Sequence, residues 1–109
     1  MAIPDDVLRA ALEEYIAFGP RTRRPARERL RERLPAEPDA VLDEALATAR
    51  EAVDVAYQLA RECSERRRSQ ASIVKELARR IPWVAAGSKG TSDDLVHHLA
   101  HFGYFLVIM

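Results

Sequence analysis

Residues 42–63, LDEALATAREAVDVAYQLAREC, contain the strongest periodic pattern in the sequence. Small and apolar side chains recur there at alternating steps of four and three, the heptad repeat of a helix that packs lengthwise against another helix. The predicted partner is either a neighbouring helix of the same chain or the same helix of a second chain. We call the residues at these steps the seam: Leu42, Leu46, Ala49, Val53, Ala56, Ala60 and Cys63.

Two shorter helices are predicted before the seam. Apolar residues at helical spacing follow Pro4, and Gly19-Pro20 is expected to end this first helix. A short basic helix over residues 25–34 comes next, because proline suits the first turn of a helix. Alanine, leucine, arginine and glutamate dominate these segments, and all four favour helix.

The long helix that contains the seam is expected to begin near Asp39, and its end is less certain from the sequence. The apolar pattern is interrupted after Cys63 and resumes at Val74, Leu77 and Ile81, which keep the same steps if the polar Arg67 and Gln70 fill the gap. One unbroken helix would be about 65 Å long, against a radius of gyration of about 13 Å for a compact domain of this size. We therefore predict a break between Ser69 and Ser72, with Ser72 capping a helix that ends at Arg80.

A last helix is predicted after Pro82, which disfavours helical geometry in the residue before it. Thr91 or Ser92 is the expected cap of this helix. Gly103 is a candidate for its end, and the apolar residues 104–109 are left either extended or helical. These segments together predict an all-α protein: a small helical bundle of four to five helices built around one long Ala-rich helix, as a single helical domain over residues 1–109.

The composition is that of an ordinary globular protein and excludes disordered, collagen-like and disulfide-rich classes, with 48% hydrophobic and 31% charged residues. Seventeen basic residues balance 17 acidic ones, so the chain as a whole is not attracted to nucleic acid or membrane. Cys63 is the single cysteine, and the N-terminal residues lack the pattern of a signal peptide. The longest apolar run, residues 102–109, is far shorter than the roughly 20 residues of a membrane span. We expect a cytoplasmic protein without a membrane partner, and the excess of arginine over lysine indicates a bacterial source.

Charged residues are segregated along the chain. Residues 19–36 contain seven arginines and two glutamates, residues 37–60 one arginine and six acidic residues, and residues 61–80 seven basic and three acidic residues. Because arginine binds phosphate with two parallel hydrogen bonds, the basic segments could form a phosphate-binding face. Alternatively, neighbouring acidic and basic helices neutralise each other. The candidate phosphate contacts are Arg66, Arg67, Arg68, Arg79 and Arg80.

Nothing in the sequence predicts a catalytic centre. His97 and His101 lie one helical turn apart with Asp93 a turn earlier, but a zinc site needs a further ligand. Cys63 has no neighbouring base in the sequence that would activate it as a nucleophile. Residues 87–92, GSKGTS, lack the full phosphate-loop pattern. We therefore expect no enzyme activity, no cofactor and no metal.

The leading hypothesis for function is a small α-helical protein–protein interaction module or assembly subunit without catalytic activity. Its partner is another protein or a second copy, with a homodimer as the expected homo-oligomer. The hypothesis rests on the seam and on the apolar residues 104–109, since an apolar segment of this kind usually packs on the core or on a partner. The alternative is a nucleic-acid-binding accessory protein that uses the arginine-rich segments, with an affinity that falls steeply as salt is added.

Overall fold

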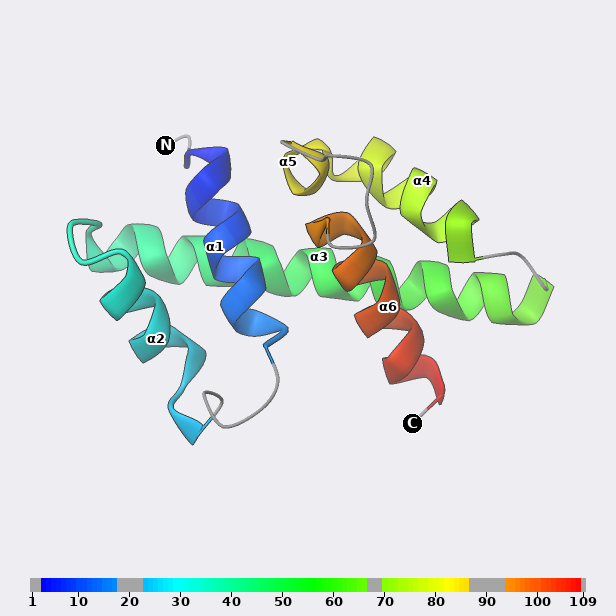
Figure 1. The fold of residues 1–109 in the computed structure, drawn as a ribbon, viewed down its shortest axis with the longest axis horizontal. Helices are drawn as coiled ribbons and strands as arrows, with labels where there is room; N and C mark the ends of the chain where they lie inside the picture. Colours follow the sequence, from blue (N-terminus) through cyan, green and yellow to red (C-terminus); the bar gives the residue numbers. More distant parts are fainter. Residues whose placement is uncertain (1–2, 18–22, 67–69, 87–93, 109) are drawn as a thin grey trace. The chain divides into compact units, whose positions relative to one another are not determined.

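The structure is a computed structural model that describes residues 3–17, 23–66, 70–86 and 94–108, together with their side chains except those of 64–66 and 70. Within these ranges it contains helices and no strand (Figure 1). The all-α helical bundle around one long Ala-rich helix is thereby confirmed. The helices are α1 (Asp5–Tyr15), α2 (Ala26–Arg33), α3 (Asp39–Arg66), α4 (Gln70–Arg80), α5 (Pro82–Ala85) and α6 (Leu95–Ile108).

Contacts divide the chain into two compact units, Met1–Arg50 and Glu51–Met109, which we call the N-terminal and the C-terminal unit. The division falls inside α3, which contributes residues to both units. A single domain over residues 1–109 stays a prediction. Each unit is therefore described by itself.

In the N-terminal unit, α1 packs against α2. Asp5 and Asp6 occupy the first turn of α1, where the positive end of the helix dipole stabilises them. The helix ends at Tyr15, before the predicted stop at Gly19-Pro20, which lies outside the described residues. Charged side chains make up most of α2, and Leu30 is its one buried residue. The apolar contribution of α2 to this unit therefore comes chiefly from one leucine.

In the C-terminal unit, α4, α5 and α6 contact one another. Pro82 stands at the start of α5, and the residue before it departs from helical geometry, with φ −128° and ψ 73°. Val84 of α5 is buried. The other buried apolar residues of these helices are Ile73, Leu77, Ile81, Val96, Leu99 and Ala100.

Gly103 lies inside α6 and does not end it, so the prediction of a stop there was wrong. A Cβ atom at this position would lie 2.7 Å from the carbonyl oxygen of Ala56 and 2.9 Å from its Cβ. The missing side chain therefore allows the backbones of α3 and α6 to approach closely. Of the two alternatives for residues 104–109, the helical one is confirmed as far as Ile108.

The structure has α3 and α4 as separate helices, as predicted, and residues 67–69 between them lie outside the described part. The predicted position of the break, between Ser69 and Ser72, was wrong, because residues 70–72 belong to α4. Ser72 does not cap α4, since that helix begins two residues earlier with Gln70 and Ala71, both acceptable helix formers. The predicted caps of α6, Thr91 and Ser92, lie outside the described residues. The Asp94 carbonyl accepts the first backbone hydrogen bonds of α6.

Candidate functional site

The seam is almost entirely buried in the isolated chain. Leu46 is half-buried, and the other six seam residues are buried. Ala56 closely approaches Gly103 of the same chain. This burial fits the alternative in which the partner of the seam is a helix of the same chain.

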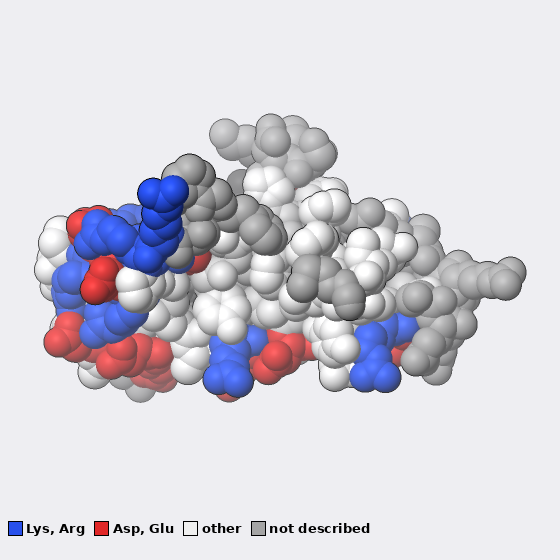
Figure 2. Space-filling model, turned by 90° about the horizontal axis from the view of Figure 1, so that it is seen from below, with Lys and Arg blue, Asp and Glu red and all other residues white. Residues whose placement is uncertain are grey.

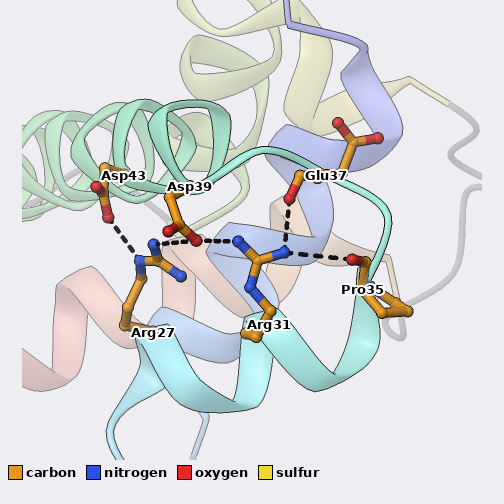
Figure 3. Close-up of polar contacts among 6 residues, drawn as sticks. All are labelled: Arg27, Arg31, Pro35, Glu37, Asp39 and Asp43. Atoms are coloured by element: carbon orange, nitrogen blue, oxygen red, sulfur yellow. Dashed lines mark hydrogen bonds and ion pairs between the residues drawn. The ribbon is translucent and has the colours of Figure 1, made fainter.

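The arginines of α2 meet acidic residues at the start of α3. Arg27 donates from Nε to Asp43 over 2.6 Å, and its Nη2 lies 3.1 Å from a carboxylate oxygen of Asp39 (Figure 3). Arg31 pairs with the same oxygen of Asp39 and donates to the backbone carbonyls of Glu37 and Pro35. Hydrogen bonds from Arg27 and then from Arg31 hold the pKa of Asp39 below its ordinary value. These two arginines of α2 therefore bind the start of α3, and Arg31 also binds the segment that connects the two helices.

The same helix carries a second set of ion pairs that faces α1. Glu14 is buried, with 2% of its side chain exposed, and its carboxylate lies 3.5 Å from Arg29 and 3.4 Å from Arg33. Arg29 is 11% exposed and also donates to the Glu14 backbone carbonyl over 3.2 Å. Arg33 reaches the exposed Glu13 over 3.0 Å. Glu14 is the one buried charged residue among the described side chains, and it is placed where two guanidinium groups converge.

A shallow pocket of about 670 Å³ lies beside this pair, lined by Glu14, Arg24, Arg29, Glu32 and Arg33. Most of its charges are paired, because Arg24 binds Glu32 over 2.5 Å and Arg29 lies 3.5 Å from Glu14. The Nε of Arg29 is buried and has no hydrogen-bond partner among the described residues. Figure 2 shows acidic and basic side chains intermixed where α2 and the beginning of α3 lie. For residues 19–36 the described contacts therefore favour neutralisation between neighbouring helices over a phosphate-binding face.

The second basic segment is described only in part. Arg66 lies in α3, but its side chain is not described, and Arg67 and Arg68 lie outside the described residues. Arg79 and Arg80 both bind Glu76 on the same face of α4. The five predicted phosphate contacts are therefore not brought together as one described cluster.

The pairing of Glu76 with Arg79 and Arg80 can be tested by titrating the Glu76 carboxyl. Hydrogen bonds from Arg79 and then from Arg80 lower its pKa from 4.5 to about 2. Because the folded-state value lies below the unfolded one, the pairing stabilises the fold above about pH 4.5, and this contribution is lost as the pH falls toward 2. We expect an NMR titration of the Glu76 side-chain carboxyl carbon to have its midpoint near 2.

Substituting Arg79→Gln and Arg80→Gln together should return the Glu76 midpoint toward 4.5. The matched control is Arg50→Gln on the exposed side of α3, which should leave it unchanged. A midpoint near 4.5 in the unsubstituted chain would show that the two arginines do not hold this carboxylate in solution.

No group of three or more histidine, cysteine, aspartate or glutamate side chains within the described ranges is arranged to hold a metal ion. Asp93 of the predicted histidine half-site is outside those ranges. Cys63 is buried as a free thiol. Among the helices that the structure describes, none is long and apolar enough to cross a membrane.

One exposed apolar surface emerges from the structure. Ile108 is 65% exposed, Tyr104 41% and Phe105 38%, and α6 contains no lysine, arginine, aspartate or glutamate. The sequence indicated that residues 104–109 are apolar, but the exposure of Tyr104, Phe105 and Ile108 on one side of a helix depends on α6 continuing through Gly103. We call the exposed side of this helix the α6 face: His98, His101, Tyr104, Phe105 and Ile108.

Comparison of the chain with protein-family models, with curated proteins and with solved structures returned no match. Its function is therefore inferred from its own residues and their arrangement.

Proposed function

We propose that the chain is a protein–protein interaction module that makes contact through the α6 face. The observation that carries the proposal is the exposure of Tyr104, Phe105 and Ile108 on a helix without a charged residue. Exposed helix faces of globular proteins are normally charged or polar. Aromatic residues are enriched, and charged residues depleted, at the centres of protein interfaces.

The contact surface we propose lies on α6 and not on the seam. The seam residues Ala49, Ala56 and Ala60 are fully buried in the isolated chain, so a partner could reach them only after the helices separate. The α6 face needs no such rearrangement, since its side chains are already exposed.

The nucleic-acid alternative draws little support from the described arginines. Five of the seven arginines in residues 19–36 bind carboxylates of the same chain, as do Arg79 and Arg80. A phosphate would have to compete with these carboxylates. We therefore place protein contact ahead of phosphate binding.

Photo-crosslinking tests the proposal without assuming which protein is bound. A photoreactive phenylalanine analogue replaces Tyr104 in cells that produce the chain, and the matched control places it at the exposed Gln58 of α3. We expect protein adducts at position 104, at several times the yield at position 58. Mass spectrometry of the adduct then identifies the partner.

Two results would contradict this function. Equal adduct yields at positions 104 and 58 would show that the α6 face has no preferred protein partner. Adducts at position 104 that disappear on nuclease treatment would instead favour the nucleic-acid alternative.

A further inference from the structure

The pocket beside Glu14 lies in the N-terminal unit, and the described residues that line it are all charged. They come from α1, from α2 and from Arg24 just before α2. The pocket volume of about 670 Å³ falls within the range of small-molecule sites, about 300–1,000 Å³. The pocket is therefore large enough for a small organic molecule.

Arg29, which lines this pocket, has a donor that lacks an acceptor. Its side chain is 11% exposed, and its Nε is buried without a hydrogen-bond partner among the described residues. Its Nη2 donates to the backbone carbonyl of Glu14 over 3.2 Å. Nε and Nη2 form an edge of the guanidinium group, and such an edge binds a carboxylate with two parallel hydrogen bonds. Buried donors are normally paired, so this half-used edge points to a ligand or a water that supplies an acceptor.

The contacts that Arg29 does make are long enough to be exchanged. Its Nη1 lies 3.5 Å from a carboxylate oxygen of Glu14, whereas hydrogen bonds between charged groups are about 2.7–2.9 Å long. Arg33 lies 3.4 Å from the other oxygen of the same carboxylate. If the Arg29 guanidinium turns toward the pocket, Glu14 therefore keeps one cationic neighbour.

We propose that this pocket binds the carboxylate group of a small organic molecule, with Arg29 as the main contact. The Nε and Nη2 of Arg29 donate two parallel hydrogen bonds to the ligand, which replace the contact with the Glu14 backbone carbonyl. The site belongs to the N-terminal unit, whereas α6 belongs to the C-terminal unit. The inference therefore goes beyond the proposed function and does not depend on it.

A carboxylate with one negative charge suits the pocket better than a phosphate. Four carboxylates of the chain pair with the three arginines of the pocket: Glu13, Glu14, Glu28 and Glu32. Each of them repels a bound anion in proportion to its charge. A phosphate group carries about −1.5 to −2 at pH 7 and is repelled more strongly than a carboxylate.

NMR of the arginine side chains tests the site directly. The probe is benzoate, which carries one carboxylate group on an apolar ring. We expect the Nε–H signal of Arg29 to shift and to saturate as benzoate is added, while the Nε–H signal of Arg79 on α4 stays in place. Sodium chloride at the same ionic strength is the control and should leave the Arg29 signal unchanged.

Two substitutions in the pocket should change the affinity for benzoate in opposite directions. Arg29→Lys keeps the positive charge beside Glu14 but lacks the two parallel N–H groups, so binding should weaken at least about tenfold. Arg27→Lys, on the same helix but outside the pocket lining, is the matched control and should bind as the unsubstituted chain does.

Glu32→Gln removes a carboxylate that lines the pocket and releases Arg24 from its ion pair. It should strengthen benzoate binding about two- to fivefold, the range expected for one exposed charge pair. Glu44→Gln makes the same change of charge at an exposed position of α3 and should leave the affinity unchanged. Since Glu32 and Glu44 are both exposed, this comparison remains decisive if Arg29→Lys does not fold.

Several results would overturn the carboxylate site. An Arg29 signal that benzoate does not move would leave an internal water as the acceptor for Nε. Equal shifts with benzoate and sodium chloride would show an effect of ionic strength alone. Tighter binding of inorganic phosphate than of benzoate would assign the pocket to a different class of anion. Equal affinities of Glu32→Gln and Glu44→Gln would place the bound benzoate elsewhere.

Discussion

Glu14→Gln is expected to lower the free energy of unfolding by about 3 kcal/mol, because removal of one partner leaves the other charge of a buried pair uncompensated. The side chain of Glu14 is 2% exposed and that of its partner Arg29 is 11% exposed. The amide keeps the shape of the carboxyl group, so the loss reports on charge rather than on a cavity. Urea unfolding followed by circular dichroism measures the difference.

The neighbouring residue supplies the control for this effect. Glu13 also binds an arginine of α2, but both of these side chains are more than 40% exposed. Glu13→Gln should therefore cost less than about 1 kcal/mol. The double substitution Glu14→Leu and Arg29→Met, which replaces the pair with apolar groups, should recover part of the loss. Equal effects of Glu13→Gln and Glu14→Gln would show that burial of the Glu14 pair does not matter.

Gly103→Ala is expected to lower the free energy of unfolding by about 2–3 kcal/mol through overpacking. The direction of this change is informative, because replacing glycine with alanine in an unconstrained helix interior raises the free energy of unfolding by about 1 kcal/mol. Here the new Cβ would meet the Ala56 carbonyl oxygen at 2.7 Å, and a backbone atom cannot move aside as a flexible side chain can. Thermal and urea unfolding both measure the change.

Gln58→Ala is the control, since it introduces alanine on the exposed side of α3 and should change stability by less than about 0.5 kcal/mol. Adding Ala56→Gly to Gly103→Ala removes the contact between the two Cβ atoms but not the one with the carbonyl oxygen. It should therefore restore little stability. A gain in stability from Gly103→Ala alone would contradict the close approach of α3 and α6.

Most of the helices could be predicted because their signals are local. Backbone hydrogen bonds within a helix join residues four apart, so local signals are sufficient to locate the helices. The prolines and helix-forming residues located α2, and the apolar spacing located α3. Helix ends were predicted less well. Ser72 and Gly103 have the residue types of a cap and a stop, but both lie inside helices. A glycine is needed at position 103 because the helix there closely approaches Ala56, which lies 47 positions earlier in the sequence.

The candidate sites could be predicted from the sequence less completely than the helices. The sequence located the basic segments but left open whether they bind phosphate or neighbouring carboxylates. For Arg27 and Arg31 the structure shows the carboxylates of the following helix. The residue type gave no sign that Glu14 is buried, because its neighbour Glu13 is the same type and is exposed. Its spacing did carry a signal, since Glu14 follows Val7 by seven residues and Ala11 by three, on the side that α1 buries.

The amino-acid sequence alone determined the all-α class, the long central helix and the residues that form its seam, since each follows from spacing within one segment. The tertiary structure decided which side of α6 is covered, why a glycine lies within it, and which carboxylate each arginine binds. These features depend on contacts between residues far apart in the sequence. Periodicity identifies the face that a helix buries, but not the neighbour that covers it.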